Sequence, residues 1–287
     1  MKNILNQISI ILVSYNSASK LKKFIKKIPK ETNILIVDNS KDFLLKKIFK
    51  KRKNVKIYYK SNQGYGSSIN FAAKKIKTPY FLVAQPDVSG ITKKVLITYY
   101  KYAKKLNDKF SAIGPHFINA PKKGHFQTDV KKDIVKIHNV HGSTIFFNKK
   151  IFFINDCFDK NIFLYWEETD YTKRASKKGF FAYQLNKVKV RHDKGKAVET
   201  TNINDSEKLK YLYIWHFIWS KYYFFKKHYG IIFSMIYFIP IFTRIIYRLS
   251  IYKNSNLSKY KKYYYRLDGL KASFLNKKSS MRLEKII

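Results

Sequence analysis

The chain lacks several features that would each define a class of protein. Only one of its 287 residues is a cysteine, Cys157, so no internal disulfide can form, and we predict a reducing, cytosolic setting. The residues ahead of Ile8 are too few and too polar for a signal peptide, which favours the same compartment. A charge-free run from Gly230 to Thr243 has about 14 residues, and a membrane-spanning helix needs about 20.

Acidic residues are also scarce. The sequence has 18 of them against 59 lysines and arginines, which gives a formal net charge of +41. Such a balance is typical of proteins that bind nucleic acid, anionic lipid or another polyanion. No zinc-finger spacing and no aromatic RNA-binding motif is present, so we expect no specific nucleic-acid partner. Lys, Asn, Ile, Phe and Tyr, which are all abundant here, are encoded by AT-rich codons. An AT-rich genome could therefore produce this net charge without a polyanionic partner, and the charge alone does not distinguish the two explanations.

Apolar runs alternate with helix-period segments in the first half of the chain. Mostly apolar runs at Ile8–Val13, Ile34–Val37, Val55–Tyr59 and Tyr80–Ala84 predict strands, and another strand is predicted at Val140–Phe147. Strands and helices that alternate at this spacing form βαβ units. We therefore predict an α/β fold with a doubly wound, mostly parallel sheet and flanking helices.

Polar and glycine residues gather where these strands end. In doubly wound sheets, ligands bind at the carboxyl ends of the strands, so this pattern predicts a nucleotide site. The residues at these ends are Ser14, Tyr15, Asn16, Asp38, Asn62, Gly64, Gly66, Gln85 and Asp87.

Two residues could hold a divalent cation. Asp87 directly follows a buried strand and Pro86, and a carboxylate there could hold Mg²⁺ or Mn²⁺ against a diphosphate. The alternative is that Asp87 caps the helix that starts near Thr92. His192, beyond a later strand, could complete the metal shell or contact phosphate, although a lone histidine is more often structural.

A cluster of carboxylates offers a candidate general base. Glu167, Glu168 and Asp170 lie within four residues, and their mutual repulsion should raise their pKa values unless cations or helix dipoles compensate. A carboxylate of this kind can remove a proton from an attacking hydroxyl. The alternative is an acidic helix N-terminus in which Asp170 pairs with Lys173 or Arg174.

The character of the chain changes near Ser206, where a long, aromatic, Lys-rich helical region begins. We predict a catalytic domain at residues 1–200 and a helical, membrane-associated region at 201–287. The run from Gly230 to Thr243 is flanked by lysines and arginines, which is typical of a helix that lies on an anionic membrane surface. The alternative is a helical hairpin that packs on the catalytic domain or on a second subunit.

The order of the short motifs closely resembles the family 2 inverting glycosyltransferases of the GT-A fold. Within that family it looks most like the rhamnosyltransferase and galactofuranosyltransferase-like branch. The resemblance covers about Ile8 to Lys196. The motifs are Val13-Ser14-Tyr15-Asn16, Val37-Asp38-Asn39-Ser40, Asn62-Gln63-Gly64-Tyr65-Gly66, Pro86-Asp87-Val88, His141-Gly142-Ser143, Trp166-Glu167-Glu168-Thr169-Asp170 and His192.

The resemblance implies a role for each matching position. Glu168 would be the catalytic base, and Asp87 with His192 would hold Mg²⁺ or Mn²⁺. The nucleotide and donor sugar would contact Ser14, Tyr15, Asn16, Asp38 (at the base), Asn62, Gly64, Gly66 and Gln85. The acceptor, or the support of the catalytic groups, would involve Trp166, Glu167, Asp170, His141 and Gly142.

Two positions depart from the family pattern. The motif often has an acidic residue or Asn where Gln85 stands, so metal binding would either be weaker or rest on Asp87 and His192. The base is often Asp, and Glu168 adds one methylene. Neither change removes the chemistry that the resemblance implies.

The resulting hypothesis is a hexosyltransferase, such as a rhamnosyltransferase, that uses a nucleoside-diphosphate sugar. Its acceptor would be a saccharide or a lipid-linked saccharide in cell-surface polysaccharide assembly. It would be cytoplasmic and peripheral on the inner face of the cell membrane. The alternative is a non-enzymatic polyanion-binding protein, for nucleic acid or anionic lipid. A dinucleotide-dependent oxidoreductase is disfavoured, because Gly64-Tyr65-Gly66 follows the third strand and lacks the third glycine of G-x-G-x-x-G.

Overall fold

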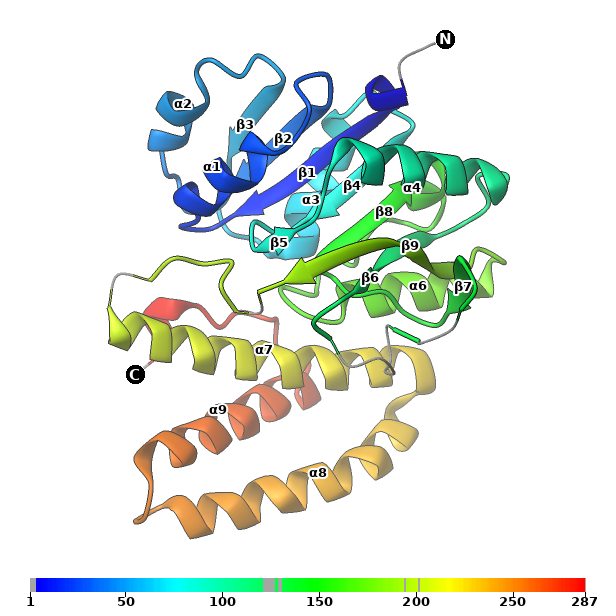
Figure 1. Cartoon of the computed structure of the whole chain (residues 1–287). Helices are drawn as coiled ribbons and strands as arrows, with labels where there is room; N and C mark the ends of the chain where they lie inside the picture. Colours follow the sequence, from blue (N-terminus) through cyan, green and yellow to red (C-terminus); the bar gives the residue numbers. More distant parts are fainter. Residues whose placement is uncertain (1–3, 121–126, 129–130, 194, 201, 287) are drawn as a thin grey trace. The chain divides into compact units, whose positions relative to one another are not determined.

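The computed structural model describes residues 4–120, 127–128, 131–193, 195–200 and 202–286 (Figure 1). The chain divides into two compact units. The first comprises Met1–Asp159 and Glu168–Glu199, and the second comprises Lys160–Glu167 and Thr200–Ile287. Residue 201, at the predicted domain boundary, lies outside the described residues.

The first unit is built on one sheet, for which nine strands are described, with the spatial order β3-β2-β1-β4-β8-β6-β9-β5 and β7 on β9. Parallel pairs join β3, β2, β1 and β4, and join β6 to β9, whereas β8 runs antiparallel to β4 and β6. The predicted α/β class with a mostly parallel sheet is confirmed. The strands are β1 (Ile8–Ser14), β2 (Asn33–Asp38), β3 (Val55–Tyr59), β4 (Tyr80–Ala84), β5 (Val88–Ser89), β6 (Ala112–Phe117), β7 (Ile134–Ile137), β8 (Thr144–Asn148) and β9 (Ala182–His192).

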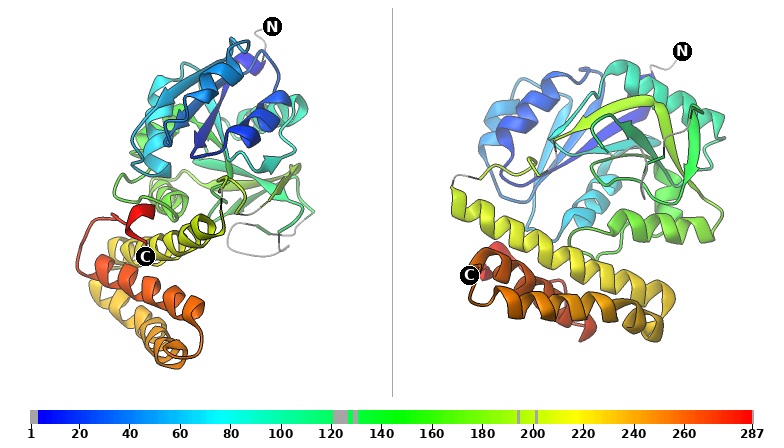
Figure 2. Two further views of the ribbon diagram at one scale, coloured as in Figure 1. Left: turned by 90° about the vertical axis from the view of Figure 1, so that its left-hand side faces the viewer. Right: turned by 60° about the horizontal axis from the view of Figure 1, so that its bottom comes forward.

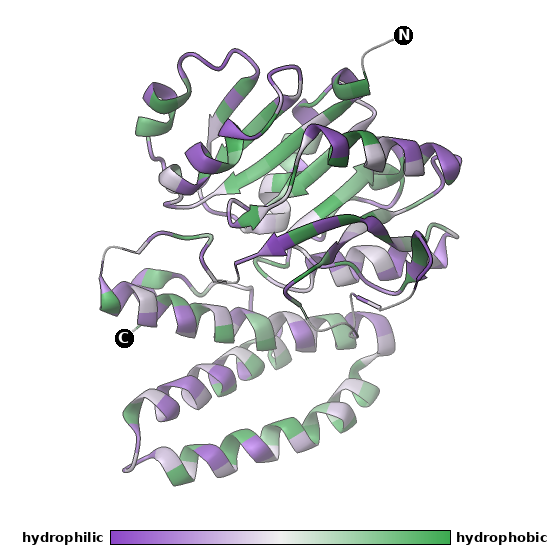
Figure 3. Ribbon diagram, viewed as in Figure 1, coloured by the Kyte–Doolittle hydropathy of each residue, from purple (hydrophilic) through white to green (hydrophobic). Residues whose placement is uncertain are grey.

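Both faces of this sheet are covered, and the central strands are apolar along most of their length (Figure 3). Successive residues of a strand point to opposite faces, so Ile10 and Leu12 enter one core cluster while Ile11 enters the other. Helices α1, α2 and α4 contribute to the first cluster, and α3, α5 and α6 to the second. The helices are α1 (Ala18–Lys26), α2 (Leu44–Phe49), α3 (Tyr65–Lys75), α4 (Lys93–Lys105), α5 (Lys149–Ile154) and α6 (Glu167–Lys177), after a short 3-10 turn, η1 (Ile4–Gln7).

One predicted strand starts later than the sequence suggested. The apolar run from Val140 was expected to be extended throughout, but β8 begins at Thr144, and His141 and Gly142 precede it in a turn. A strand ladder would have committed the backbone groups of these residues to neighbouring strands. The turn leaves them available to the site described below.

The second unit consists of three long helices and a short 3-10 turn, shown from two further directions in Figure 2. They are α7 (Ile203–Tyr229), α8 (Ile231–Tyr252), α9 (Leu257–Phe274) and η2 (Leu283–Lys285). Gly230, at φ 85°, lies between α7 and α8, a backbone conformation that favours glycine. At Gly269, a Cβ atom would lie 2.6 Å from the Trp215 carbonyl oxygen, so α7 and α9 pack closely only because this position lacks a side chain.

Helix α8 is longer than the apolar run that indicated it. It continues through Pro240 and past Arg244 and Arg248 as one helix of 22 residues. Among the described residues, it is the one helix long and apolar enough to cross a membrane by length and composition. Most of its surface is not covered within the unit: Ile232 is 73% exposed and Ile236 is 63% exposed.

The segment Lys160–Glu167 is packed on α7 and on the end of the chain, within the second unit. The Leu164 carbonyl accepts a hydrogen bond from Ser220 Oγ (2.9 Å). The Phe163 ring stacks on His216 at 4.5 Å between centroids, and the Arg282 guanidinium lies 3.7 Å from the Phe163 centroid. Three residues from two later parts of the chain therefore hold this short segment in place.

Two consecutive aromatic residues of this segment have a left-handed backbone. Tyr165 has φ 66° and Trp166 has φ 70°, and for bulky side chains this conformation costs about 1–3 kcal/mol each. Their rings are held by neighbours on α7: the Trp166 centroid lies 5.1 Å from Phe224 and the Tyr165 centroid 5.7 Å from Phe217. Packing on α7 offsets the backbone cost directly before α6 begins.

Candidate active site

The ends of β1 and β2 form one wall of the site. Ser14 pairs opposite Asp38 in the sheet. The buried Asp38 carboxylate accepts hydrogen bonds from Ser40 Oγ (2.9 Å) and from the Asp42 N–H (2.8 Å). Ser40 Oγ in turn accepts from the N–H of Asn16 (3.1 Å), a left-handed residue at φ 46°. Asp38, which the resemblance assigns to the nucleotide base, thus already shapes the loop around Asn16.

The turn before α3 forms a second wall. The Gly64 N–H donates to Asn62 Oδ1 at 3.2 Å, and Gly64 has φ 103°, where a side chain would be strained. Gly66 is buried in the first turn of α3. Tyr65 donates its hydroxyl to the Gly142 carbonyl at 3.0 Å, which ties the start of α3 to the turn before β8.

Asp87 and His192 meet at the carboxyl end of the sheet. The antiparallel pairing of Val88 with His192 brings them together, and His192 Nε2 lies 3.4 Å from Asp87 Oδ2. The Asp87 side chain is 2% exposed and that of His192 is 9% exposed. Neither Asp87 carboxylate oxygen and neither His192 ring nitrogen has a hydrogen-bond partner among the described residues. Asp87 is therefore not the cap of α4, whose N-cap is Thr92.

The backbone of His192 is fixed by an asparagine. Asn119 Nδ2 donates to the His192 carbonyl (2.9 Å), and the His192 N–H donates to Asn119 Oδ1 (3.1 Å). The ring of His141 lies 5.1 Å from that of His192, and both are beside Phe117. His141 Nδ1 accepts from the Ser143 N–H at 3.2 Å, which sets the tautomer of a neutral ring. The Asp87 and His192 side chains are thus oriented while their polar atoms stay unused.

These two residues fit a divalent cation as part of its shell. Carboxylate oxygen and neutral imidazole nitrogen are both suitable ligands, and buried polar atoms without partners are costly unless a ligand satisfies them. In the described part of the chain, no cluster of three His, Cys, Asp or Glu side chains could hold a metal. The remaining positions would therefore come from water and from the oxygens of a bound diphosphate. The Gln85 N–H donates a hydrogen bond to the Ser143 carbonyl (2.8 Å), which joins the end of β4 to the turn before β8.

A cavity of about 270 Å³ lies beside Asp87 in the first unit. Lysines from α1 and from the segment after β9 line it together with Asp87 and Asp193: they are Lys20, Lys23, Lys27 and Lys196. Four ammonium groups against two carboxylates give this cavity an excess of positive charge. Lys196 is far from α1 in the sequence, so the convergence of these lysines depends on the fold.

Glu168 lies against the turn before β8. A Cβ atom at Gly142 would lie 3.4 Å from the Glu168 carboxylate, so the absence of a side chain leaves the carboxylate close to the backbone there. Burial raises the pKa of Glu168 from 4.5 to about 7, although hydrogen bonds from the N–H groups of Glu168 and Gly142 act in the opposite direction. Oε2 has no hydrogen-bond partner among the described residues. Near neutral pH, this carboxylate can therefore exchange a proton with a nearby hydroxyl.

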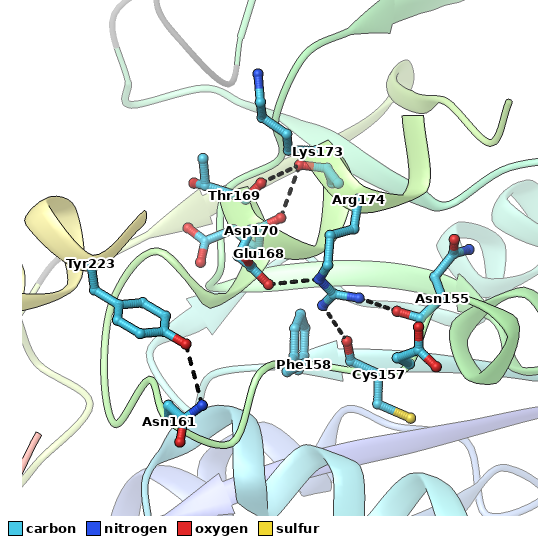
Figure 4. A network of polar contacts seen from close by, with 12 residues as sticks. Asn155, Cys157, Phe158, Asn161, Glu168, Thr169, Asp170, Lys173, Arg174 and Tyr223 are labelled. Atoms are coloured by element: carbon cyan, nitrogen blue, oxygen red, sulfur yellow. Dashed lines mark hydrogen bonds and ion pairs between the residues drawn. The ribbon is translucent and has the colours of Figure 1, made fainter. Parts of the chain in front are cut away.

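Asp170 has a structural partner. Its side chain is fully buried, and Oδ2 accepts from Arg174 Nε at 2.8 Å (Figure 4). The same guanidinium donates to the carbonyl of Cys157 (2.6 Å) and to that of Asn155. The pairing that the sequence offered as an alternative for Asp170 is what the structure contains. It fixes α6 to the loop after α5, and so holds the helix that carries Glu168.

Arg174→Met is expected to destabilise the protein by about 3–5 kcal/mol, because it leaves the Asp170 carboxylate buried without its cation. Lys178→Met is the matched control. Its ion pair with Asp156, at 3.4 Å, is exposed and should contribute about 1 kcal/mol or less. Urea unfolding followed by circular dichroism measures both variants. An equal loss in the two would show that the buried pair contributes no more than the exposed one.

Trp166 and Glu167 belong to the segment of the second unit that leads into α6. Trp166 packs on Phe224, and Glu167 is buried at 4% exposure. The segment is further tied by the Asn161 side-chain amide, which donates to the Tyr223 hydroxyl at 3.2 Å (Figure 4). Of the residues expected near the acceptor, Trp166 is therefore positioned by contacts with α7. Tyr15 is half-buried and follows β1.

Cys157 is not a candidate nucleophile. Burial raises the pKa of its thiol to about 11, so the thiolate is scarce at neutral pH. The thiol therefore takes no part in the chemistry considered below.

Several positioning residues were missed in the sequence. Asn39 Nδ2 donates to Ser68 Oγ at 2.9 Å and joins the end of β2 to α3. Asn119 holds His192, and Tyr65 holds Gly142. Only Asn39 carried a local signal, its place directly after a strand. The others act through partners distant in the sequence.

A family model described as glycosyl transferase family 2 matches residues 9–153, just over half of the chain. The match includes Asp87 and Gly142 and ends before Glu168 and His192. No curated protein sequence matches the chain.

Solved structures are similar at low sequence identity. GalNAc-T7 with UDP, GalNAc and Mn²⁺ superposes with a TM-score of 0.56 at 14% identity, over 76% of this chain and 49% of that one. S. aureus TarS has a TM-score of 0.53 at 13% identity, over 94% of this chain and 55% of that one. This chain thus spans about half the length of both. TarS 1–349 in complex with UDP-GlcNAc has a TM-score of 0.53 at 14% identity, and the superposition covers 94% of this chain and 92% of that one. The likeness extends the fold to most of the chain, and the family match, with a GT-A type sheet, shows that the chain belongs to glycosyl transferase family 2.

Proposed function

We propose that this chain is an inverting glycosyltransferase that moves a sugar from a nucleoside-diphosphate donor to an acceptor hydroxyl. The observation that carries the proposal is the Glu168 carboxylate, whose pKa of about 7 suits a general base at neutral pH. The carboxylate takes the proton of the acceptor hydroxyl, and that oxygen forms a bond to the anomeric carbon. The bond to the diphosphate breaks in the same step, so the configuration inverts.

The leaving diphosphate gains negative charge, which this site is built to stabilise. Lysines of the cavity beside Asp87 supply positive charge where the diphosphate would lie. A divalent cation bound by Asp87 and His192 would neutralise further charge on the diphosphate oxygens. GalNAc-T7 was solved with UDP and Mn²⁺, and TarS with UDP-GlcNAc, which favours a UDP-linked donor and Mn²⁺ for this chain.

The finer proposal is a hexosyltransferase of the rhamnosyltransferase or galactofuranosyltransferase-like branch, acting in cell-surface polysaccharide assembly. It rests on the order of the sequence motifs.

We further propose that the protein is cytoplasmic and peripheral on the inner face of the membrane, with α8 lying in the interface between the membrane and water. Residues 200–287 carry seventeen lysines and arginines against four carboxylates, and α8 combines exposed aliphatic side chains with Arg244 and Arg248. Those arginines and the packing of α8 on α7 and α9 favour an interfacial helix over a spanning one.

Isothermal titration of UDP, dTDP and GDP, each with and without Mn²⁺, tests the proposal. We expect one of them, UDP first, to bind at micromolar concentration and to bind more weakly without the metal. The same protein should sediment with phosphatidylglycerol vesicles and not with phosphatidylcholine vesicles. If no nucleotide binds, while DNA and anionic vesicles bind in a salt-sensitive way, the polyanion-binding alternative replaces the enzyme.

A further inference from the structure

The second unit contains a cavity of about 290 Å³ at which all three of its long helices meet. Its walls include Ile218 from α7, Ile245 from α8 and Tyr263 from α9, all buried. Each helix also contributes one cation to the lining: Lys221 from α7, Arg244 from α8 and Arg266 from α9.

The charge of this cavity is not balanced by protein carboxylates. No carboxylate is among its lining residues, and for these three cations no ion pair is found within the described part of the chain. Lys221 lies 5.0 Å from the Tyr237 ring centroid, a contact that orients the ammonium group without neutralising it. Three like charges that line one small cavity repel one another, so an anion bound there would be stabilised.

The nearest acidic side chains in sequence are engaged elsewhere. Asp268, on the same helix as Arg266, accepts a hydrogen bond from Trp215 Nε1 at 2.6 Å. Glu207, on α7, accepts one from the Tyr211 hydroxyl at 2.7 Å. Neither carboxylate is among the residues that line the cavity, so a bound anion would add the negative charge that the lining lacks.

The chemistry of the lining favours phosphate. Two guanidinium groups supply planar pairs of N–H donors that match the spacing of phosphate oxygens, and an ammonium group adds a third charge. A volume of about 290 Å³ is at the lower end for ligand sites, so it suits a head group and not a whole lipid.

The surface beside the cavity favours an amphiphile. Ile232, Ile236 and Ile239 are spaced for one face of α8, and they are 73%, 63% and 58% exposed. Arg244, which lines the cavity, follows Ile239 by five residues on the same helix, about 7.5 Å along its axis and on an adjoining face. An exposed aliphatic stripe next to a cationic cavity is complementary to a hydrocarbon chain with a phosphate at its end.

We propose that this cavity binds the phosphate or diphosphate of an amphiphile whose hydrocarbon chain lies along the exposed face of α8. The proposal deepens the proposed function, on which it rests, because it names the class of molecule that carries the acceptor sugar. Lys221, Arg244 and Arg266 hold the phosphate, while Ile232, Ile236 and Ile239 contact the chain.

Binding of dodecyl phosphate, below its micelle concentration, to the full chain tests the proposal. The variant Arg244→Gln/Arg266→Gln should bind at least about tenfold more weakly, because each lost contact is a charge-assisted hydrogen bond. The control Lys253→Gln/Lys271→Gln removes the same charge from exposed positions that do not line the cavity, and should bind as the unchanged protein does. Ile232→Ser/Ile236→Ser, at exposed positions where folding is not at risk, should weaken dodecyl phosphate and leave inorganic phosphate unaffected.

An equal loss in the cavity variant and the control would overturn the proposal, since bulk charge would then explain binding. Inorganic phosphate that binds as tightly as dodecyl phosphate would overturn the amphiphile assignment, and dodecyl maltoside that binds as tightly would overturn the phosphate assignment. Unfolding midpoints and UDP binding of each variant show that the fold and the first unit are intact. Sugar transfer that survives loss of the Glu168 carboxylate would reject the proposed function alone, because dodecyl phosphate binding does not depend on that residue.

Discussion

Glu168→Gln is expected to lower the rate of sugar transfer by about 10²–10⁴-fold, the usual contribution of a positioned general base. The amide is nearly isosteric with the carboxylate but cannot take a proton from the acceptor. Nucleotide binding should stay within about twofold, because no contact of Glu168 with the ends of β1 and β2 is found in the described residues. Single-turnover transfer from a UDP-sugar and calorimetric binding of UDP separate the two effects. Glu31→Gln, at an exposed position, is the control.

The pH dependence identifies the base independently. Because Glu168 must be ionised to act and burial raises its pKa to about 7, the rate should rise with pH up to about 7 and then level off. At pH 6 only about a tenth of the carboxylate is ionised. Glu168→Asp should show the same rise of the rate with pH at a lower overall rate, and Glu168→Gln should show no such rise. A rate independent of pH between 5 and 8 would assign the proton transfer to another group.

The same shift predicts a gain in stability for the inactive variant. The native state holds the Glu168 proton more tightly than the unfolded chain does, so the free energy of unfolding falls as pH rises from about 4.5 to 7. Gln carries no charge to bury, and Glu168→Gln should therefore be more stable by on the order of 1–3 kcal/mol at pH 8, and little changed at pH 4. If Glu168→Gln instead lost both nucleotide binding and stability, Glu168 would be a structural residue.

Asp87→Asn is the second substitution with a large expected effect. It should weaken Mn²⁺-dependent nucleotide binding by about 100-fold or more, because a cation bound at the proposed site would lose the Asp87 carboxylate as a ligand. Asp193→Asn is the matched control. Asp193 lines the same cavity, but it is exposed and its backbone, not its side chain, pairs with Asp87.

The thermal response separates metal binding from folding. Without metal, Asp87→Asn should not lower the melting temperature, because the Asp87 carboxylate is buried and makes no hydrogen bond among the described residues. With Mn²⁺ and UDP, the unchanged protein should melt at a higher temperature and the variant should not. The rise in melting temperature of His192→Gln with Mn²⁺ and UDP should lie between those of the unchanged protein and of Asp87→Asn. Equal responses of Asp87→Asn and Asp193→Asn would remove Asp87 from the metal site.

The sequence was sufficient for the parallel half of the sheet. The predicted runs at Ile8–Val13, Ile34–Val37, Val55–Tyr59 and Tyr80–Ala84 match β1 to β4 within a residue or two. Strands β1, β2 and β4 are buried along most of their length, so they are almost entirely apolar and easy to recognise, whereas the edge strand β3 is half-buried and includes Lys56. The polar residues that follow them lie at the strand ends for the same reason.

Features that depend on distant partners could not be predicted in this way. The start of β8 depends on its antiparallel pairing with β4 and β6, which no local pattern records. Proline inside a helix usually breaks or kinks it, but α8 passes through Pro240, supported by packing on α7 and α9. In each case, tertiary contacts outweigh the local sequence preference.

The packing of Lys160–Glu167 has a consequence for the order of folding. His216, Ser220 and Arg282, which hold this segment, all come after β9 in the chain. During synthesis from the N-terminus, the sheet can be complete before any of these partners has emerged. The left-handed backbone at Tyr165 and Trp166, directly before Glu168, would then be among the last features to form. A nascent chain would accordingly bind nucleotide before it could transfer sugar, because the backbone leading into Glu168 would not yet be set.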